Sequence, residues 1–543
     1  MRNKWIPAAL ALAMLLSCAA CTGSETGESQ SPAPTQSAPL QSTAAQSGGT
    51  EETAVVLSDE GVTVDGQAAS TDPASAVYVG AEIVYYEDGH DETYGEGTAE
   101  EAHSAEEAAA HTVVTITQPG TYRLSGTLSA GQVAVDLGED AEDDPDAVVT
   151  LILDGVDITC TVAPAVIFYN VYECGSKDTE TASPAVDTSA AGANVILADG
   201  STNTVTGSHV ARIYKEGTQD KLHKYDGAFY SKMSMNVSGE SDESGTLNII
   251  ADNEGLDSEL HLTINSGSIF ITSQNDGINT NEDGVSVTTI NGGRLSINAG
   301  LGAEGDGIDS NGYLTINAGE VVTVANGQSG DGGIDSDSGI YLNGGSVLAL
   351  GSRNDAVETD SGQAYMEMSF AGEQAAGSSI VIKDSEGNEL ISYTAERAFS
   401  SLTYTGADLT DGATYSVYVD GVQQQFTGHS FGMGGGQPQD GQQPPEDMSE
   451  PPEDMGEPPE NMEEPPEDMG EPPQGGEMPE GERPERPEGA GEDGQQPPQP
   501  TDGGDRQPPE GGMAGAETAE PSTEFTISAD THSFSGVTGV QSE

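Results

Sequence analysis

The stretch EGDGIDSNGYLTINAGE, residues 304–320, decides the fold, because its pattern returns several times along the chain. Related copies read NDGINTN, DGGIDSDSG and NDAVETDSG, and the small residue of this motif recurs at Gly255, Gly277, Gly307, Gly333 and Ala356. A fixed order of markers with spacings of about 22–30 residues is typical of a solenoid whose turns tolerate insertions. Each turn has room for about three short strands, so the sequence predicts a parallel β-helix.

Alignment of the turns gives three apolar columns, each flanked by polar residues at alternate positions, as strands with one buried face require. The columns are Leu256, Ile278, Ile308, Ile334 and Val357; Ile264, Ile290, Ile316 and Leu342; and Ile269, Leu295, Val321 and Val347. A polar column of Asn265, Asn291, Asn317 and Asn343 follows the second of these. We expect its amides to stack from turn to turn and to satisfy backbone groups at a bend.

Acidic residues flank the first apolar column on both sides. They are Glu254, Asp276, Asp306 and Asp355 on one side, and Asp257, Asn279, Asp309, Asp335 and Glu358 on the other. Neighbouring turns lie about 4.8 Å apart, so stacked carboxylates repel by roughly 1 kcal/mol even in water. A calcium ion between turns would relieve this repulsion, because calcium accepts carboxylate, amide and carbonyl oxygens.

The predicted calcium ligands centre on Asp309 and Asp335, which share a register on adjacent turns. The full set is Asp257, Asp276, Asn279, Asp306, Asp309, Asp331, Asp335 and Asp337. The alternative is that each Asp or Asn serves only as a turn residue beside Gly. No pattern in the sequence identifies a catalytic residue, and the residues that contact a ligand are not identified either.

The net charge limits the possible partners, and the N-terminal sequence indicates the cellular location. The formal net charge is −76, from 92 acidic and 16 basic residues, which excludes nucleic acid as a partner. The N-terminus has a basic start and a short apolar run, typical of an export signal, followed by LLSCAAC. This pattern predicts lipidation at Cys18 or Cys21 and a lipid-anchored protein on the extracellular face of the cell membrane. Plain secretion is the alternative.

Composition shifts divide the chain into seven segments. We expect a lipoprotein signal peptide (1–21), a disordered tether (22–53), an N-terminal region of strands and one short helix with a Ser104 cap (54–110), the parallel β-helix (111–361), an antiparallel β module (362–433), a disordered acidic Pro-rich segment (434–521) and C-terminal strands (522–543). The fold class is therefore all-β: a right-handed parallel β-helix with an antiparallel module and disordered segments. In an exported chain, Cys160 and Cys174 could form a disulfide or stay reduced.

Several segments together resemble a known family, the clostridial carbohydrate-binding proteins with a pectate-lyase-like β-helix. They include VVTITQPGTYRLSGTLSAGQVAVDL, VTLILDGVDITCTVAPAVI, ANVILADGSTNTVTG and KYDGAFYSK, and the resemblance covers residues 112–351. It implies polysaccharide binding with acidic polymers such as polygalacturonate as ligands, no established lyase activity, and calcium at turn carboxylates, which matches Asp309 and Asp335. The only Trp is Trp5 in the export signal, so a flat platform for neutral glycans would rest on Tyr.

These observations favour a calcium-stabilised β-helix lipoprotein on the bacterial cell surface that binds an acidic, pectin-like polysaccharide without catalysis. Two alternatives stay open. The first is a calcium-dependent polysaccharide lyase, and the second is a structural or adhesive protein whose solenoid serves only as a stalk.

Overall fold

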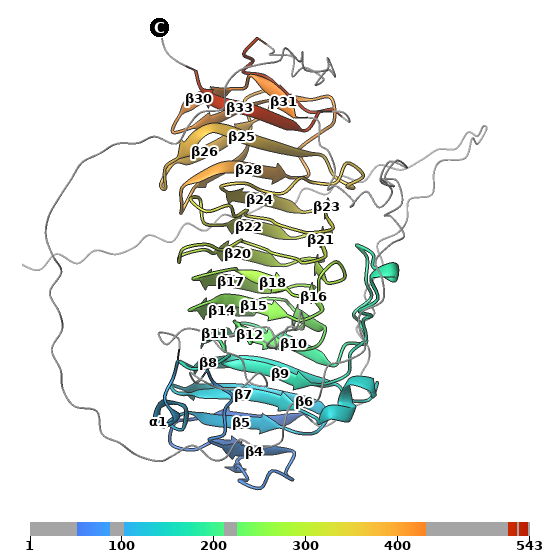
Figure 1. Cartoon of the computed structure of the whole chain (residues 1–543), viewed down its shortest axis with the longest axis vertical. Coiled ribbons are helices and arrows are strands. Elements are labelled where there is room, and N and C mark those ends of the chain that lie inside the picture. Colours follow the sequence, from blue (N-terminus) through green and yellow to red (C-terminus); the bar gives the residue numbers. More distant parts are fainter. Residues whose placement is uncertain (1–51, 87–101, 211–224, 431–519, 529–530, 541–543) are drawn as a thin grey trace, which may run out of the picture. The chain divides into compact units, whose positions relative to one another are not determined.

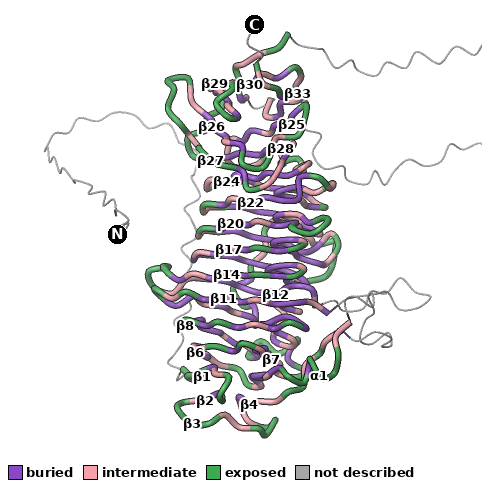
Figure 2. The backbone as a smooth tube through the Cα atoms, turned by 90° about the vertical axis from the view of Figure 1, so that its left-hand side faces the viewer, coloured by how far each residue is buried: buried purple, intermediate pink, exposed green. Residues whose placement is uncertain are grey.

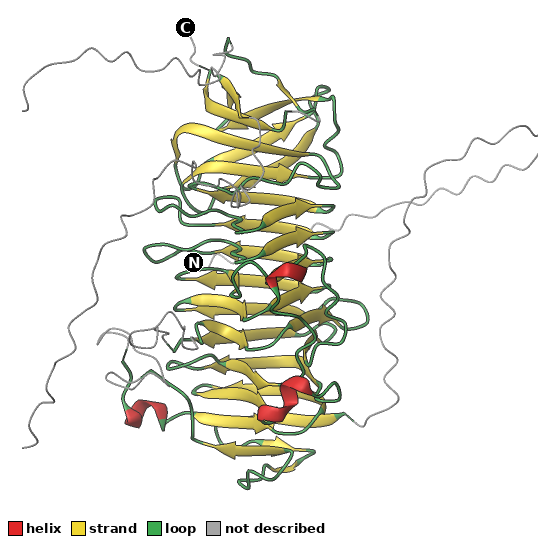
Figure 3. Cartoon of the chain, turned by 45° about the vertical axis from the view of Figure 1, so that its right-hand side comes forward, coloured by secondary structure: helices red, strands yellow, loops and turns green. Residues whose placement is uncertain are grey.

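The computed structural model describes residues 52–86, 102–210, 225–430, 520–528 and 531–540. The predicted signal peptide, the lipidated cysteine, nearly all of the tether and nearly all of the Pro-rich segment lie outside the described residues. The chain divides into two compact units, residues 1–50 and 51–543, and all described residues belong to the second. Strands make up nearly all of its regular structure (Figure 3), and the expected all-β class with parallel sheets is confirmed.

Three ladders of parallel strands form the main part, and the chain visits them in a repeating order (Figure 1). We name them ladders A, B and C. Ladder A continues from β6 (Gly120–Leu128) and β8 (Val149–Thr159) through β10 (Ala193–Leu197), β13 (Met235–Gly239), β16 (His261–Ile264), β19 (Val287–Ile290), β21 (Tyr313–Ile316) and β23 (Gly339–Leu342).

Ladder B shares the long strands β6 and β8, each of which is interrupted by a shift in register and so contributes to both ladders. It continues through β11 (Thr202–Gly207), β14 (Thr246–Ala251), β17 (Ser268–Ser273), β20 (Arg294–Asn298), β22 (Glu320–Val324) and β24 (Ser346–Gly351).

Ladder C consists of β5 (Thr112–Ile116), β7 (Gly131–Asp136), β9 (Val166–Asn170), β12 (Gly227–Ser231), β15 (Glu254–Ser258) and β18 (Ile278–Thr280). Single bridges from Ile278 to Ile308 and from Ile308 to Ile334 extend it.

The register of the three apolar columns confirms most of the sequence alignment. Ile264 pairs with Ile290, and the third column pairs in the same way from Ile269 onward. These side chains point inward and are fully buried, and Figure 2 shows the buried backbone running through the stacked strands. One expectation is wrong: Val357 pairs with Ile340 of ladder A and not with Ile334. The Asp355 N–H donates to the Ile334 carbonyl at 3.1 Å, so Asp355 and not Glu358 follows Asp335 in the acidic column.

The Asn column forms the amide ladder that the sequence predicts. Each Nδ2 donates to the Oδ1 of the preceding Asn, with distances of 3.0 Å from Asn291 to Asn265, 2.9 Å from Asn317 to Asn291 and 3.0 Å from Asn343 to Asn317. The last Oδ1 accepts from the Gly362 backbone N–H at 3.0 Å. The ladder therefore ends by satisfying a backbone group, which is its structural role.

The N-terminal region adds strands β1 (Thr53–Leu57), β2 (Thr63–Val64), β3 (Gln67–Ala68) and β4 (Val77–Gly80), and the short helix α1 (Ala105–Ala108). β1 pairs in parallel with β6, and β4 pairs antiparallel with β5. The Ser104 Oγ accepts from the Glu107 N–H at 3.1 Å, so the predicted helix and its cap are confirmed. Two 3₁₀ turns lie at Glu139–Asp143 and Thr179–Thr181. Within the described residues, no helix has the length and apolar character needed to span a membrane.

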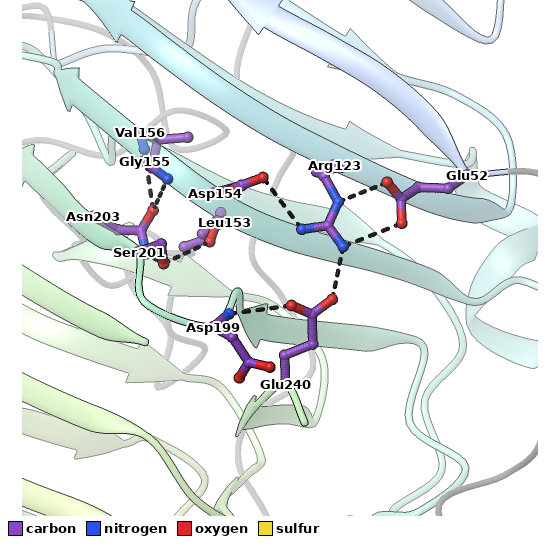
Figure 4. Close-up of polar contacts among 10 residues, drawn as sticks. All are labelled: Glu52, Arg123, Leu153, Asp154, Gly155, Val156, Asp199, Ser201, Asn203 and Glu240. Atoms are coloured by element: carbon purple, nitrogen blue, oxygen red, sulfur yellow. Dashed lines mark hydrogen bonds and ion pairs between the residues drawn. The ribbon is translucent and has the colours of Figure 1, made fainter. Parts of the chain in front are cut away.

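A cluster of charges around Arg123 joins the start of the described chain to the strands (Figure 4). The guanidinium of Arg123 on β6 lies 2.6 Å from Glu52, 2.7 Å from Glu240 and 3.3 Å from Asp154. Glu52, as the largest cause, and Glu240 raise the pKa of Arg123. One base therefore bridges three acids that would otherwise repel one another, and it holds Glu52 against ladders A and B.

Beyond β24 most strand pairs are antiparallel. This part contains β25 (Tyr365–Gln374), β26 (Ser379–Lys383), β27 (Glu389–Thr394), β28 (Phe399–Thr405), β29 (Thr414–Val419), β30 (Val422–Gln425), β31 (Gly428–Ser430), β32 (Phe525–Thr526) and β33 (Ser533–Gly539). β25 and β33, which pair in parallel, are an exception. β28 pairs antiparallel with β24, and β33 pairs antiparallel with β31, so the chain returns to this part after the Pro-rich segment. Phe426, Phe525 and Phe534 pack together there, with ring centroids 4.8–5.0 Å apart.

Candidate functional site

The acidic columns lie along ladder C and its extension. Asp257 pairs directly with Asn279, and the backbone N–H groups of Asp309 and Asp335 donate to the carbonyls of Ile278 and Ile308, each at 2.8 Å. Successive turns therefore place Asp257, Asn279, Asp309 and Asp335 at the same position of the rung. This is the register that the repeat predicted.

Glycine brings the turns close together at this edge. The N–H of Gly277 donates to Asp306 O at 3.0 Å, and the N–H of Ile278 donates to Gly307 O at 3.1 Å. A Cβ at Gly307 would lie 2.4 Å from Gly333 O and 1.9 Å from Thr323 Oγ1. No side chain fits between these backbones, so glycine is required for the acidic residues on either side to stack.

The acids before each glycine make hydrogen bonds to a neighbouring turn. Asp276 Oδ1 accepts from the Asp306 N–H at 2.7 Å, and Asp306 Oδ1 accepts from the Gly332 N–H at 2.6 Å. Asp331 Oδ2 accepts from the Gly305 N–H at 2.6 Å. Asp276, Asp306 and Asp331 therefore have the structural role that the turn-residue alternative assigns to them, whether or not they also bind an ion.

Three fully buried carboxylates meet at the lower end of the column. Oxygens of Asp226, Glu254 and Asp257 all lie within 4.8 Å of one another, and the three residues are at most 2% exposed. Asp257 Oδ1 accepts from Asn281 at 2.9 Å, but Asp257 Oδ2 has no hydrogen-bond partner among the described residues. Asn279 donates to Glu254 Oε2 at 3.2 Å, and its own Oδ1 likewise has no such partner.

Burial and mutual repulsion raise the pKa of the carboxyl groups along the column. Burial is the largest cause at each of them, and it raises the pKa of Asp309 to about 8 and those of Asp306 and Asp335 to about 7. Burial, followed by Asp226 and Glu254, also holds the pKa of Asp257 well above its usual range. The charged groups that perturb these four residues are all carboxylates. Without a cation, part of the column therefore has to hold protons at neutral pH.

The predicted residues thus gather along one edge, with Asp337 among the carboxylates that raise the pKa of Asp309. Sequence reasoning missed Asp226 and did not count Glu254 as a ligand. Asp226 precedes Gly227 in the same Asp-Gly dipeptide that occurs at Asp276 and Asp306. That dipeptide was the signal that could have found it.

The two cysteines do not form the disulfide that the sequence left open. Cys160 and Cys174 are both free thiols. Cys160 follows β8 and is buried in the core among the ladders, whereas Cys174 lies in the segment between β9 and β10 and is partly exposed. Burial raises the pKa of each thiol to about 11, so both are protonated at neutral pH.

A family profile described as carbohydrate-binding domain-containing protein matches residues 110–414. The chain belongs to this family. The matched residues include all of the acidic column and nearly all strands of the three ladders.

A curated relative and a solved structure each match part of the chain. A carbohydrate-binding domain-containing protein of Acetivibrio thermocellus is 31% identical over 160 residues, which are 29% of this chain and 44% of the relative. The chain thus matches less than half the length of that relative. A gadolinium derivative of the polysaccharide lyase-like protein from C. thermocellum is similar at 20% identity, over 55% of this chain and 94% of that one, with a TM-score of 0.30.

Proposed function

We propose that this chain is a surface lipoprotein that binds an acidic polysaccharide through a calcium-stabilised, right-handed parallel β-helix, without catalysis. The family match over residues 110–414 is the observation that supports polysaccharide binding. The β-helix is supported by the repeating order in which the chain visits ladders C, A and B from β12 to β24, with every step within a ladder parallel.

The chemistry of the acidic column supports calcium. Its groups are carboxylates and one amide, the oxygen ligands that calcium prefers, and oxygens that share a calcium at 2.3–2.6 Å lie within about 5 Å of each other. The trio of Asp226, Glu254 and Asp257 meets that spacing, at 4.8 Å. Asp257 Oδ2 and Asn279 Oδ1 are buried oxygens that a cation would satisfy. We assign the residues of the column as ligands, with Asp309 and Asp335 on the upper turns.

The charge of the chain makes cations necessary for an acidic ligand. A chain of net charge −76 attracts a polyanion only if cations neutralise part of its surface. Calcium held by carboxylates of both partners would supply this neutralisation. Replacing calcium by a chelator should therefore weaken polysaccharide binding and lower the stability of the protein together.

Binding to polygalacturonate is the first test. We expect retention on immobilised polygalacturonate in calcium and a loss of affinity of at least about tenfold, or ~1.4 kcal/mol, in excess chelator. Affinity electrophoresis measures both conditions, and magnesium at the same ionic strength controls for charge screening. Equal retention in calcium and in chelator would contradict calcium-mediated binding, and no retention of any acidic glycan in calcium would favour the stalk alternative.

The same samples test the lyase alternative. A lyase would release unsaturated uronate, whose absorbance rises during incubation, whereas we expect no change. Lys232, which follows β12, is the candidate general base for this alternative. Burial lowers the pKa of this lysine, as a general base requires. If absorbance rises, Lys232→Met is the variant that should abolish it.

Membrane attachment is tested separately, because Cys18 and Cys21 lie outside the described residues. Changing both to Ser should release the protein from the membrane fraction into the medium, since one acyl-modified cysteine would be its anchor. Immunoblots of the two fractions measure this, with Cys174→Ser as the control that should leave attachment unchanged. Unchanged membrane partition of the double variant would refute the lipoprotein assignment.

A further inference from the structure

A segment between two strands crosses the outer face of ladder A. We call residues 171–191, between β9 and β10, the crossing segment (Figure 1). Thr188 Oγ1 lies 2.7 Å from Asn236 Oδ1 and 2.7 Å from Thr263 Oγ1, and the Thr315 hydroxyl donates to Pro184 O at 2.7 Å. These contacts attach the segment to outward-facing side chains of β13, β16 and β21.

A cavity of about 180 Å³ lies between the crossing segment and the sheet. This is far more than the ~10–15 Å³ that one water molecule needs. Cys174, Ser176, Ser183 and Asp187 of the segment line it on one side, and His261 and Val285 line it on the other. The cavity therefore offers hydroxyl groups, one carboxylate and apolar surface within one small volume.

His261 is the buried polar group that faces this cavity. It is 3% exposed, and its Nδ1 accepts from the Val287 N–H at 3.1 Å. Nδ1 therefore carries no proton, and the proton of the neutral ring lies on Nε2. Burial lowers the pKa of His261 to about 4, so the ring is neutral at physiological pH.

No residue in the described part of the chain accepts a hydrogen bond from the Nε2–H of His261. The Nε2–H points toward the crossing segment, because a Cβ at Gly175 would lie 2.7 Å from Nε2. This donor is therefore available to a ligand that enters the cavity.

We propose that this cavity binds one uncharged sugar unit of the polysaccharide. A sugar ring presents hydroxyl groups to the Nε2–H of His261, to Ser176 and Ser183, and to the carboxylate of Asp187, and its apolar face fits Val186 and Val285. No Lys or Arg lines the cavity, and Lys177 of the same segment is paired with Glu282 at 2.5 Å. The Asp187 carboxylate disfavours a uronate here. The inference rests on the proposed polysaccharide binding for its class of ligand, but not on calcium.

Protection of Cys174 from alkylation tests the proposal, because its thiol lines the cavity while Cys160 is buried elsewhere. The full chain is treated with N-ethylmaleimide in the presence of glucose, galactose, mannose or galacturonate, and peptide mass mapping follows the label at Cys174. We expect at least one neutral hexose to slow alkylation by about tenfold at ten times its Kd, and galacturonate to have no effect. If no neutral hexose slows alkylation of the parent, or if galacturonate alone protects it, the inference is overturned.

Variants of the crossing segment provide matched controls. Ala182 lines the cavity, whereas Ala185 is exposed on the same segment and does not. Ala182→Phe should abolish hexose protection and Ala185→Phe should keep it, with Ser183→Phe as a second filling variant in case the first does not fold. Protection that survives in a folded filling variant would refute this cavity as the site. Retention of the parent protein on polygalacturonate in calcium is measured in parallel. Loss of that retention refutes the proposed function, whereas loss of hexose protection in the parent refutes only this inference.

Discussion

Saturating calcium should raise the melting temperature of this protein, and the double change Asp309→Asn and Asp335→Asn should remove most of that rise. A cation that binds only the folded state stabilises it by about 2.7 kcal/mol at a hundred times its Kd. Both carboxyls have pKa values raised to about 7–8 by burial and by neighbouring carboxylates. Thermal unfolding with calcium and with chelator measures the response.

The control variant removes two acids from the exposed 3₁₀ turn at Glu139–Asp143. Asp140→Asn with Asp143→Asn changes the net charge equally but should keep the full calcium response. In chelator, the Asp309 and Asp335 double variant should match or exceed the parent in stability, because stacked charges no longer repel. A double variant with the full calcium response would refute these two residues as ligands. If Asp257→Asn alone abolishes the response, the ion lies at the lower trio.

The pH dependence has a definite sign. The raised pKa values mean that the folded state binds more protons than the unfolded state above about pH 4, so the free energy of unfolding without calcium should fall as pH rises toward about 8. Saturating calcium should reverse or flatten this slope, because the ion binds the deprotonated carboxylates.

The second large effect is expected at the glycines that bring the turns together. Gly307→Ala should destabilise the protein by about 3 kcal/mol or more, since the new methyl group would collide with the Gly333 carbonyl and the Thr323 hydroxyl, and one of these is backbone. Denaturant unfolding followed by circular dichroism measures the change in the free energy of unfolding.

Gly330→Ala is the matched control. No atom lies within 4 Å of a Cβ at Gly330, and its backbone is not in the left-handed region. This change should be neutral or stabilise by up to about 1 kcal/mol, through the unfolded chain. If Gly307→Ala and Gly330→Ala have the same effect on stability, the turns can separate enough to accept a side chain. Glycine would then not be required for the acidic residues to stack.

The periodic features of this protein could be predicted from the sequence, because equivalent residues recur at the same position of every turn. Ile264, Ile290 and Ile316 recur in one register, so any strand that buries one of them buries all of them, and the pairing follows. The amides of the Asn column stack for the same reason. Asp309 and Asp335 were found in this way, as equivalent residues on adjacent turns.

Features outside the repeat were decided by tertiary structure. Asp226 carries the Asp-Gly dipeptide of the repeat, but only the pairing of β12 with β15 shows that its carboxylate meets those of Glu254 and Asp257. His261 faces a cavity only because a distant segment crosses over β16, and Cys160 and Cys174 are separated by the sheet that lies between core and surface. The sequence by itself determined the apolar, Asn and acidic columns, because the two-residue alternation of a strand and the repeated turn depend only on residues close together in the sequence. The cavity required the fold, because its contacts join parts of the chain that no local period relates. The buried acidic trio required it because only the positions of the side chains bring the three carboxylates together.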